Sequence, residues 1–147
     1  MNIRLATVED VETLFEIRCS VVENHMSREE LAEMGITPEA VREMVLSGDY
    51  VVPVVEVDGR GVGFAMGEVP EGFVFAVFVR PAHEGQGVGR ALLRVVEEEF
   101  ARRGVSEAWL ATGAEESLRA RGFYRHQGWT DAGVLEDGQM RMTKRLG

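Results

Sequence analysis

Three glycines at alternate positions, Gly85, Gly87 and Gly89, mark the segment of this chain best suited to bind a ligand. They follow the continuous apolar run 73–79 and Pro81, and they precede a segment with helical spacing. This order predicts a strand, a glycine-rich turn and a helix. Glycine lets the backbone approach a ligand closely, and the first turn of a helix leaves its N–H groups without intrahelical partners. Together with the positive end of the helix dipole, these groups would bind phosphate.

Two common phosphate-binding motifs do not match. A P-loop ends in Gly-Lys-Ser/Thr, whereas Gly89 is followed by Arg90 and Ala91. The dinucleotide fingerprint needs a sixth-position glycine, where this chain has Arg90, and an acid roughly twenty residues further on, where it has Trp109. The glycines alone would also fit an ordinary loop between a buried strand and its helix, so a second signal is needed.

The segment 84–89 resembles the acetyl-CoA signature of the GNAT superfamily of N-acetyltransferases, Gln/Arg-x-x-Gly-x-Gly/Ala, which follows a strand ending in Val-x-Pro. Here the strand ends in Val79-Arg80-Pro81, and the signature reads Glu-Gly-Gln-Gly-Val-Gly. Glu84 departs from the Gln or Arg that the family prefers.

A second resemblance covers residues 117–129, where the family typically carries Asn-x-x-Ala-x-x-Leu/Phe-Tyr-Glu-Lys-x-Gly-Phe. Matching or equivalent positions are Ser117, Ala120, Phe123, Tyr124, Gly128 and Trp129. The departures are Ser117 for Asn, Arg125 for Glu and Trp129 for Phe. The two signatures occur in the family's order and spacing.

The resemblance implies the GNAT fold, an α/β structure in which a mixed, twisted central sheet is flanked by helices and splays open for the cofactor. It extends over residues 1–147, which we expect to form a single N-acetyltransferase domain of ordinary size. The pattern of the residues predicts the order β-α-α-α-β-β-β-α-β-α-β-β, with strands at 2–6, 50–57, 62–68, 73–79 and 107–112, two strands around Asp137-Gly138, and a last helix at 115–126.

The chemistry that the resemblance implies is direct attack of an amine on the thioester of acetyl-CoA, without a covalent enzyme intermediate. The positions implied to bind acetyl-CoA are Val77, Val79, Glu84, Gly85, Gln86, Gly87, Val88, Gly89, Arg90 and Ser117. A backbone N–H near Val77 would donate to the oxygen on which negative charge develops.

Tyr124 occupies the position of the family's tyrosine, so the resemblance implies that it protonates the leaving thiolate. In an alternative interpretation, its ring only fills the core. Glu68 is the candidate base because it ends the strand before the central one, although a single acid is more often a surface group. The loop with Glu23, Asn24 and His25 would contact the acceptor.

The residue composition limits the compartment in which the protein works and the partners that it can bind. Cys19 is the only cysteine, so no intrachain disulfide can form and a reducing compartment is favoured. The longest apolar run, 73–79, is far too short to cross a bilayer, and the first residues do not resemble a signal peptide, so we expect a cytoplasmic protein. A net charge of −9 argues against nucleic acid as a partner. It suits a cationic acceptor but is also explained by solubility. No metal-ligand spacing occurs, so no metal is expected.

Two functions therefore remain. In the first, the chain acetylates a primary amine of a small molecule. In the second, it is an acetyl-CoA-binding regulatory module, or its acceptor is a protein N-terminus or lysine. Retention of Tyr124 favours the first. A homodimer is compatible with either function.

Overall fold

The computed structural model describes residues 1–113 and 117–147, and of Ser117 and Leu118 it describes the backbone alone. The strands are β1 (Asn2–Leu5), β2 (Tyr50–Val51), β3 (Pro53–Val57), β4 (Arg60–Glu68), β5 (Phe73–Val79), β6 (Glu107–Thr112), β7 (Thr130–Val134) and β8 (Met140–Arg145). The helices are α1 (Val11–Arg18), α2 (Arg28–Glu33), α3 (Pro38–Leu46), α4 (Val88–Arg102) and α5 (Ser117–His126), with short 3₁₀ turns η1 (Val8–Asp10) and η2 (Pro81–His83).

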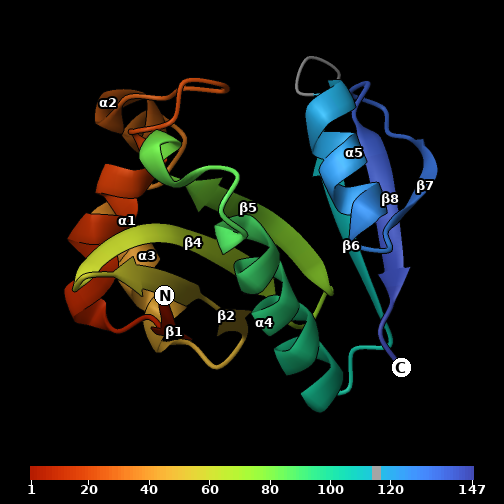
Figure 1. The fold of residues 1–147 in the computed structure, drawn as a ribbon, viewed down its shortest axis with the longest axis horizontal. Helices are drawn as coiled ribbons and strands as arrows, with labels where there is room; N and C mark the ends of the chain where they lie inside the picture. Colours follow the sequence, from red (N-terminus) through yellow and green to blue (C-terminus); the bar gives the residue numbers. More distant parts are fainter. Residues whose placement is uncertain (114–116) are drawn as a thin grey trace.

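The predicted α/β fold, a mixed sheet flanked by helices, is confirmed (Figure 1). β1 ends one residue earlier and β4 begins two residues earlier than predicted, and one predicted strand is divided. The predicted strand 50–57 is interrupted before Pro53, which lacks a backbone N–H, and forms β2 and β3 instead. The predicted start of the last helix, at Glu115, lies outside the described residues. Among the described residues, no helix combines the length and apolar character needed to span a membrane.

The sheet has the strand order β1-β3-β4-β5-β6-β8-β7, with β2 beside β4. Neighbouring strands run antiparallel except for β5 and β6, which are parallel and share the single register pair Phe73↔Trp109. The N–H of Trp109 donates to the carbonyl of Gly72 at 2.8 Å. Beyond this point β5 and β6 separate, so the sheet is paired at one end and open at the other (Figure 1).

A β-bulge in β5 changes which face its side chains occupy. Met66 of β4 pairs with Ala76 and the next residue, Gly67, pairs with Val74, so Phe75 is the extra residue. On the C-terminal side of the bulge, Val77 packs with the core under α4. Phe73, on the N-terminal side of the bulge, is not among the residues packed in that core. It pairs with Glu68 of β4, and its ring contacts that of Phe75.

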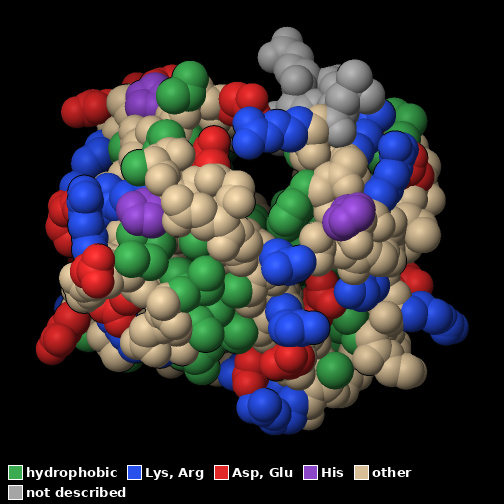
Figure 2. Space-filling model, in the orientation of Figure 1, with side chains coloured by type: hydrophobic (Ala, Val, Ile, Leu, Met, Phe, Trp, Pro, Cys, Tyr) green, Lys and Arg blue, Asp and Glu red, His purple; other side chains and the backbone are tan. Residues whose placement is uncertain are grey.

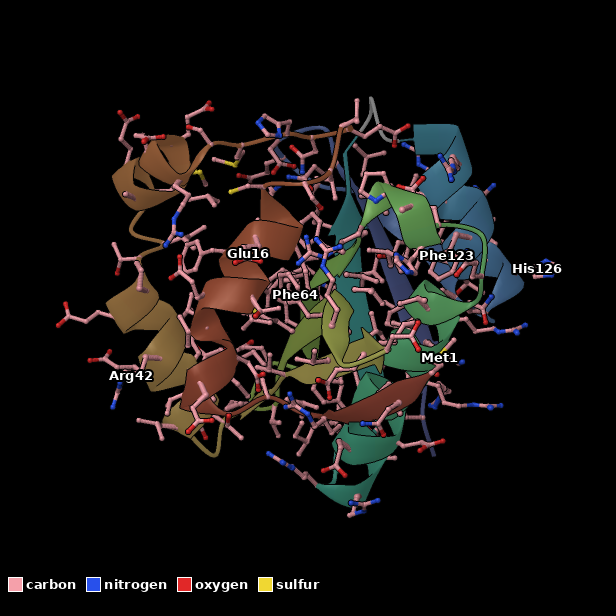
Figure 3. The ribbon with its side chains drawn as sticks, turned by 60° about the vertical axis from the view of Figure 1, so that its left-hand side comes forward. Met1, Glu16, Arg42, Phe64, Phe123 and His126 are labelled. Carbon is pink, nitrogen blue, oxygen red and sulfur yellow. The ribbon has the colours of Figure 1, made fainter. Side chains whose placement is uncertain are left out.

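The sheet has a hydrophobic core on each face. One core lies under α4 and includes Leu92, Val96 and Phe100, all 0% exposed. The other core is formed largely by α1, α3 and the opposite face of β3 and β4; it includes Phe64, which is labelled in Figure 3. Burial of a large apolar side chain contributes about 1.5–3 kcal/mol, so these two cores fix the helices on the sheet.

Two glycines of β4 allow α4 to lie close to the sheet. A Cβ on Gly63 would lie 2.8 Å from Val88 Cγ1, and one on Gly67 would lie 2.7 Å from the ring of Phe100. Both distances are shorter than real side chains tolerate, so any larger residue here would push the helix away from the sheet.

The C-terminal half is attached to α4 through one acid. The indole N–H of Trp129 donates to Glu97 at 3.1 Å, and Lys144 of β8 binds the same carboxylate at 2.6 Å. Trp129 is only 1% exposed, so its N–H needs a buried partner. This contact gives a structural reason for Trp at a position where the family typically has Phe.

We expect the Gly63→Ala variant to lose about 1–3 kcal/mol of unfolding free energy, because the added methyl group overpacks the contact between β4 and the start of α4. Urea unfolding measures the loss. Gly48→Ala is the control, since a Cβ there meets nothing within 4 Å. Equal unfolding midpoints for the two variants would contradict the close approach of α4.

Candidate active site

The gap between β5 and β6 forms a cleft of about 1290 Å³. Its walls come from residues 74–79 of β5, residues 83–85 and 87–90 of the turn and the start of α4, the end of β6, and one side of α5. Figure 2 shows a hollow at this place, between the half of the molecule that carries α1 and the half that carries α5.

The turn before α4 presents free backbone N–H groups to this cleft. Gly85 and Gly87 have φ angles of 75° and 82°, which are left-handed conformations that suit glycine, and Gly87 is the N-cap of α4. The N–H groups of residues 85–87 donate to no other described residue. The N–H groups of Val88, Gly89 and Arg90 lie in the first helical turn, where no intrahelical acceptor exists. The turn therefore forms an anion-binding cradle.

The cradle is also sterically open. A Cβ built on Gly85 meets nothing within 4 Å, and one on Gly87 meets only the end of the Arg90 side chain at 3.7 Å. Blue side chains lie over α4 beside the hollow in Figure 2, and Arg90 lines the cleft. The residues present therefore fit a pyrophosphate in both space and charge.

Glu84, the acid that departs from the family's signature, is paired across the cleft. Its carboxylate lies 3.6 Å from the guanidinium of Arg119 in α5, and both residues line the cleft. The side chains are 45% and 72% exposed, so the pair is weak. Even so, it places a cation at the same entrance and partly offsets the unfavourable charge of Glu84.

Two N–H groups of β5 point into the cleft. The N–H of Arg80 donates to the carbonyl of Val62, just beyond the paired strands β4 and β5. N–H directions alternate along an antiparallel strand, so the N–H groups of Val79 and Val77 point away from β4. On that side β6 has already separated, and both residues line the cleft.

Tyr124 lies where α5 borders the cleft. Its ring contacts those of Phe123 and Trp129 with centroids 5.2 and 6.1 Å apart, and it packs against the core under α4. Tyr124 thus both packs in the core and lines the cleft. His126 is exposed and projects to the outside in Figure 3, away from the cleft.

The structure brings most of the predicted site residues to the cleft. Those that line it are Glu23, Asn24, Val77, Val79, Glu84, Gly85, Gly87, Val88, Gly89, Arg90 and Tyr124. Three predicted residues, Gln86, His25 and Glu68, do not line the cleft. Gln86 is exposed, and a ring nitrogen of His25 lies 3.0 Å from the carbonyl oxygen of Val21. Glu68 pairs with Phe73 at the end where the turn joins β4 to β5. The side chain of Ser117 lies outside the described part.

Sequence reasoning missed several lining residues. Gln127 follows the end of α5 three residues after Tyr124, a spacing that would have pointed to it, whereas Arg119, five residues before Tyr124, has no such signal. Phe75 lines the cleft because it is the extra residue of the bulge, and the sequence gives no clear sign of a bulge there. His83 also lines the cleft, and its Nδ1 is buried without a hydrogen-bond partner among the described residues. No group of three or more His, Cys, Asp or Glu suited to a metal occurs among those residues.

Comparison with known proteins agrees with this geometry. Two curated relatives are similar in sequence. The [ribosomal protein bS18]-alanine N-acetyltransferase of Escherichia coli K12 is 33% identical over 79 residues, 52% of this chain and 53% of that protein. The chain thus spans about half the length of this relative. Acetyltransferase Atu2258 of Agrobacterium fabrum is 28% identical over 137 residues, 92% of this chain and 88% of that protein.

Solved structures show the same fold. The PaiA N-acetyltransferase of Thermoplasma acidophilum, solved in complex with coenzyme A, superposes with a TM-score of 0.85 at 18% identity over 98% of both chains. A putative acetyltransferase of Salmonella typhimurium, solved with acetyl-CoA, has a TM-score of 0.76 at 22% identity and covers 100% of this chain and 94% of its own. The model of the acetyltransferase (GNAT) family matches residues 12–129. The resemblance seen in the sequence is confirmed, and the chain belongs to the acetyltransferase (GNAT) family.

Proposed function

We propose that this chain transfers an acetyl group from acetyl-CoA directly to a primary amine of a small molecule. The observation that carries the proposal is the cleft between β5 and β6, which has an open cradle of N–H groups at its mouth and Tyr124 on its wall. Family membership and the coenzyme A complexes of the structural neighbours support it.

The chain's own groups suit each part of acetyl-CoA. The N–H groups of residues 85–90 would bind the pyrophosphate, with Arg90 and Arg119 adding positive charge at the entrance. The N–H groups of Val77 and Val79 would bind the acyl end, where β5 has no partner strand on the side of β6. When bound, acetyl-CoA supplies an activated acetyl group on a thiol that can leave.

The acceptor must lose a proton before it reacts, because an ordinary primary amine has a pKa of about 10.4 and is charged at neutral pH. Of the described acids, Glu23 and Glu84 line the cleft, and Glu84 is paired with Arg119. Glu23 is therefore the acid best placed to receive the proton, directly or through water. Glu68, our prediction from the sequence, would need a water chain to reach the cleft from its closed end.

Tyr124 is the proton donor in this proposal. The sulfur of coenzyme A leaves more easily if it is protonated as its bond to the acetyl carbon breaks, because a thiol with a pKa of roughly 8.5 is the stable form near neutral pH. The phenol lies on the cleft wall that α5 provides, and its ring is held by Phe123 and Trp129. The Val77 N–H would donate to the carbonyl oxygen as negative charge develops there.

A second acceptor class is a protein N-terminus. The observation that favours it is the similarity to the E. coli enzyme, whose name describes acetylation of an alanine of ribosomal protein bS18. Titration with acetyl-CoA and an assay of thiol release over small amines and short peptides separates these classes. Binding of acetyl-CoA without turnover on any acceptor would instead indicate a regulatory module.

We expect Gly87→Val to abolish binding of coenzyme A, because a branched side chain at φ 82° strains the turn and covers the cradle. Isothermal titration measures the affinity. Gly104→Val is the matched control, since Gly104 has φ 89° but lies at the far end of α4. It should show the same strain with normal affinity, and normal affinity in both variants would place the cradle elsewhere.

Glu84→Gln should tighten coenzyme A binding by about three- to tenfold, because it removes an anion beside the pyrophosphate and releases Arg119. The gain should shrink as salt is raised, since the charges are exposed. Weaker binding by the variant would mean that the Glu84–Arg119 pair shapes the site rather than opposing the ligand.

Tyr124→Phe should lower kcat by about 10²- to 10⁴-fold, the usual contribution of a general acid, with unchanged affinity for coenzyme A. The loss should be largest at high pH, where solvent protons are scarce. Thr130→Val, which removes an exposed hydroxyl from a residue that does not line the cleft, is the control. A kcat and pH profile equal to those of the parent protein would show that Tyr124 only fills the core.

A further inference from the structure

Three large aromatic side chains belong to neither hydrophobic core. Phe73 and Phe75 of β5 and Trp109 of β6 are absent from both sets of packed core residues, and Phe75 is 36% exposed. Phe73 and Trp109 are half-buried, so together with Phe75 they leave aromatic surface open to solvent outside both cores. Such a group on a monomer is a typical binding site.

These rings contact one another in a row. Phe73 stacks on Trp109 with centroids 4.1 Å apart and an interplanar angle of 16°, and it contacts Phe75 at 5.8 Å. Tyr50 of β2 meets Phe75 edge-on at 6.2 Å. We call these four residues, Tyr50, Phe73, Phe75 and Trp109, the aromatic platform.

The platform lies on the face of the sheet opposite α4 and α5. Alternate residues of β6, Ala108 and Leu110, pack in the core under α4, so Trp109 faces the other way. The core on that other face involves α1, α3, β3 and β4, and none of its members comes from β6 or β8. Figure 1 likewise shows α1, α2 and α3 over the half of the sheet that lacks β6 and β8.

The platform is continuous with the cleft, because Phe75 belongs to both. Strands rise about 3.3 Å per residue, so Phe75 lies about 7 Å and Phe73 about 13 Å along β5 from Val77. An acceptor whose nitrogen approaches the acyl end beside Val77 would extend its body over these rings.

The guanidinium of Arg141 lies at the edge of the platform formed by Trp109. Arg141 of β8 lies over the ring of Trp109 at 4.5 Å, and no carboxylate of the described residues lies within ion-pair distance of it. Its strand neighbour in β6, Ala111, lines the cleft. At the opposite edge stands Glu68, which pairs with Tyr50 and Phe73. An anion on the platform would therefore turn toward Arg141.

We propose that the aromatic platform binds the acceptor, and that this acceptor is a primary amine carrying a flat aromatic group followed by a carboxylate. The amine enters the cleft past Phe75, the ring lies on the exposed ring of Phe75 and against the edges of Phe73 and Trp109, and the carboxylate meets Arg141. The assignment rests on the proposed function and names the acceptor class for it. Offset stacking of rings is worth about two- to tenfold in affinity, and a charge-assisted hydrogen bond adds to that.

Three amines test the platform: butylamine, 2-phenylethylamine and 4-(2-aminoethyl)benzoate. With acetyl-CoA present, kcat/KM from thiol release should rise at least about threefold at each step of that series. Binding to the coenzyme A-loaded protein is followed separately through the change in tryptophan fluorescence, which Trp109→Phe should remove because the second emitter, Trp129, is buried in the core under α4. The benzoate should bind with the lowest Kd.

Two variants distinguish the contribution of the aromatic contact at Phe75 from that of the charge on Arg141. Phe75→Leu should reduce the ratio of kcat/KM between 2-phenylethylamine and butylamine. Arg141→Gln should reduce the ratio between the benzoate and 2-phenylethylamine and leave the first ratio intact. Arg42→Gln is the control, because Arg42 projects from α3 on the far side of the molecule in Figure 3, and it should change neither ratio.

Equal kcat/KM for the three amines, unaffected by Phe75→Leu, would overturn the platform while leaving amine acetylation intact. Benzoate-selective binding without turnover of any amine would support the platform and refute the proposed function. If light scattering shows a dimer that Phe75→Asp dissociates, the rings form an interface between copies of the chain, and the proposal is overturned.

Discussion

The separation of β5 from β6 is the constraint on which the rest of the structure depends. The strands are held together at one end by the pair Phe73↔Trp109 and by the hydrogen bond from Trp109 to Gly72. Beyond this pair, the N–H groups of β5 that face β6 have no partner strand. Backbone N–H groups without a partner are tolerated only where another group or water can accept their hydrogen bonds. The cleft thus supplies unpaired donors at its centre as a direct consequence of sheet topology.

The helices convert this opening into a site of defined chemistry. Gly63 and Gly67 bring α4 so close to β4 that its N-terminus opens at the mouth of the cleft. On the other side, Trp129 and Lys144 share the carboxylate of Glu97, and this contact fixes the C-terminal half on α4. The cradle and the wall with Tyr124 are therefore positioned by packing, and the ligand does not have to assemble them.

The sequence predicts the parts of the site that local rules govern. Alternate glycines before a helix identify the cradle, and the second signature identifies Tyr124, because turns and helix ends depend on a few adjacent residues. Positions beyond the bulge at Phe75 could not be predicted. Simple alternation would put Phe73 and Val77 on one face, whereas the extra residue moves Phe73 to the opposite face, beside Glu68. Arg119 and His83 reach the cleft through tertiary packing, which no local pattern reports.

The central claim is that acetyl-CoA occupies the cleft between β5 and β6, with its phosphates on the turn before α4. Titration of ¹⁵N-labelled protein with coenzyme A, followed by amide chemical shifts, tests this claim residue by residue. The account predicts that the largest shifts occur at residues 85–90 and at Val77 and Val79, with little change in β1 or α3. Saturable binding with shifts confined to other residues, or with none in the turn, would contradict it.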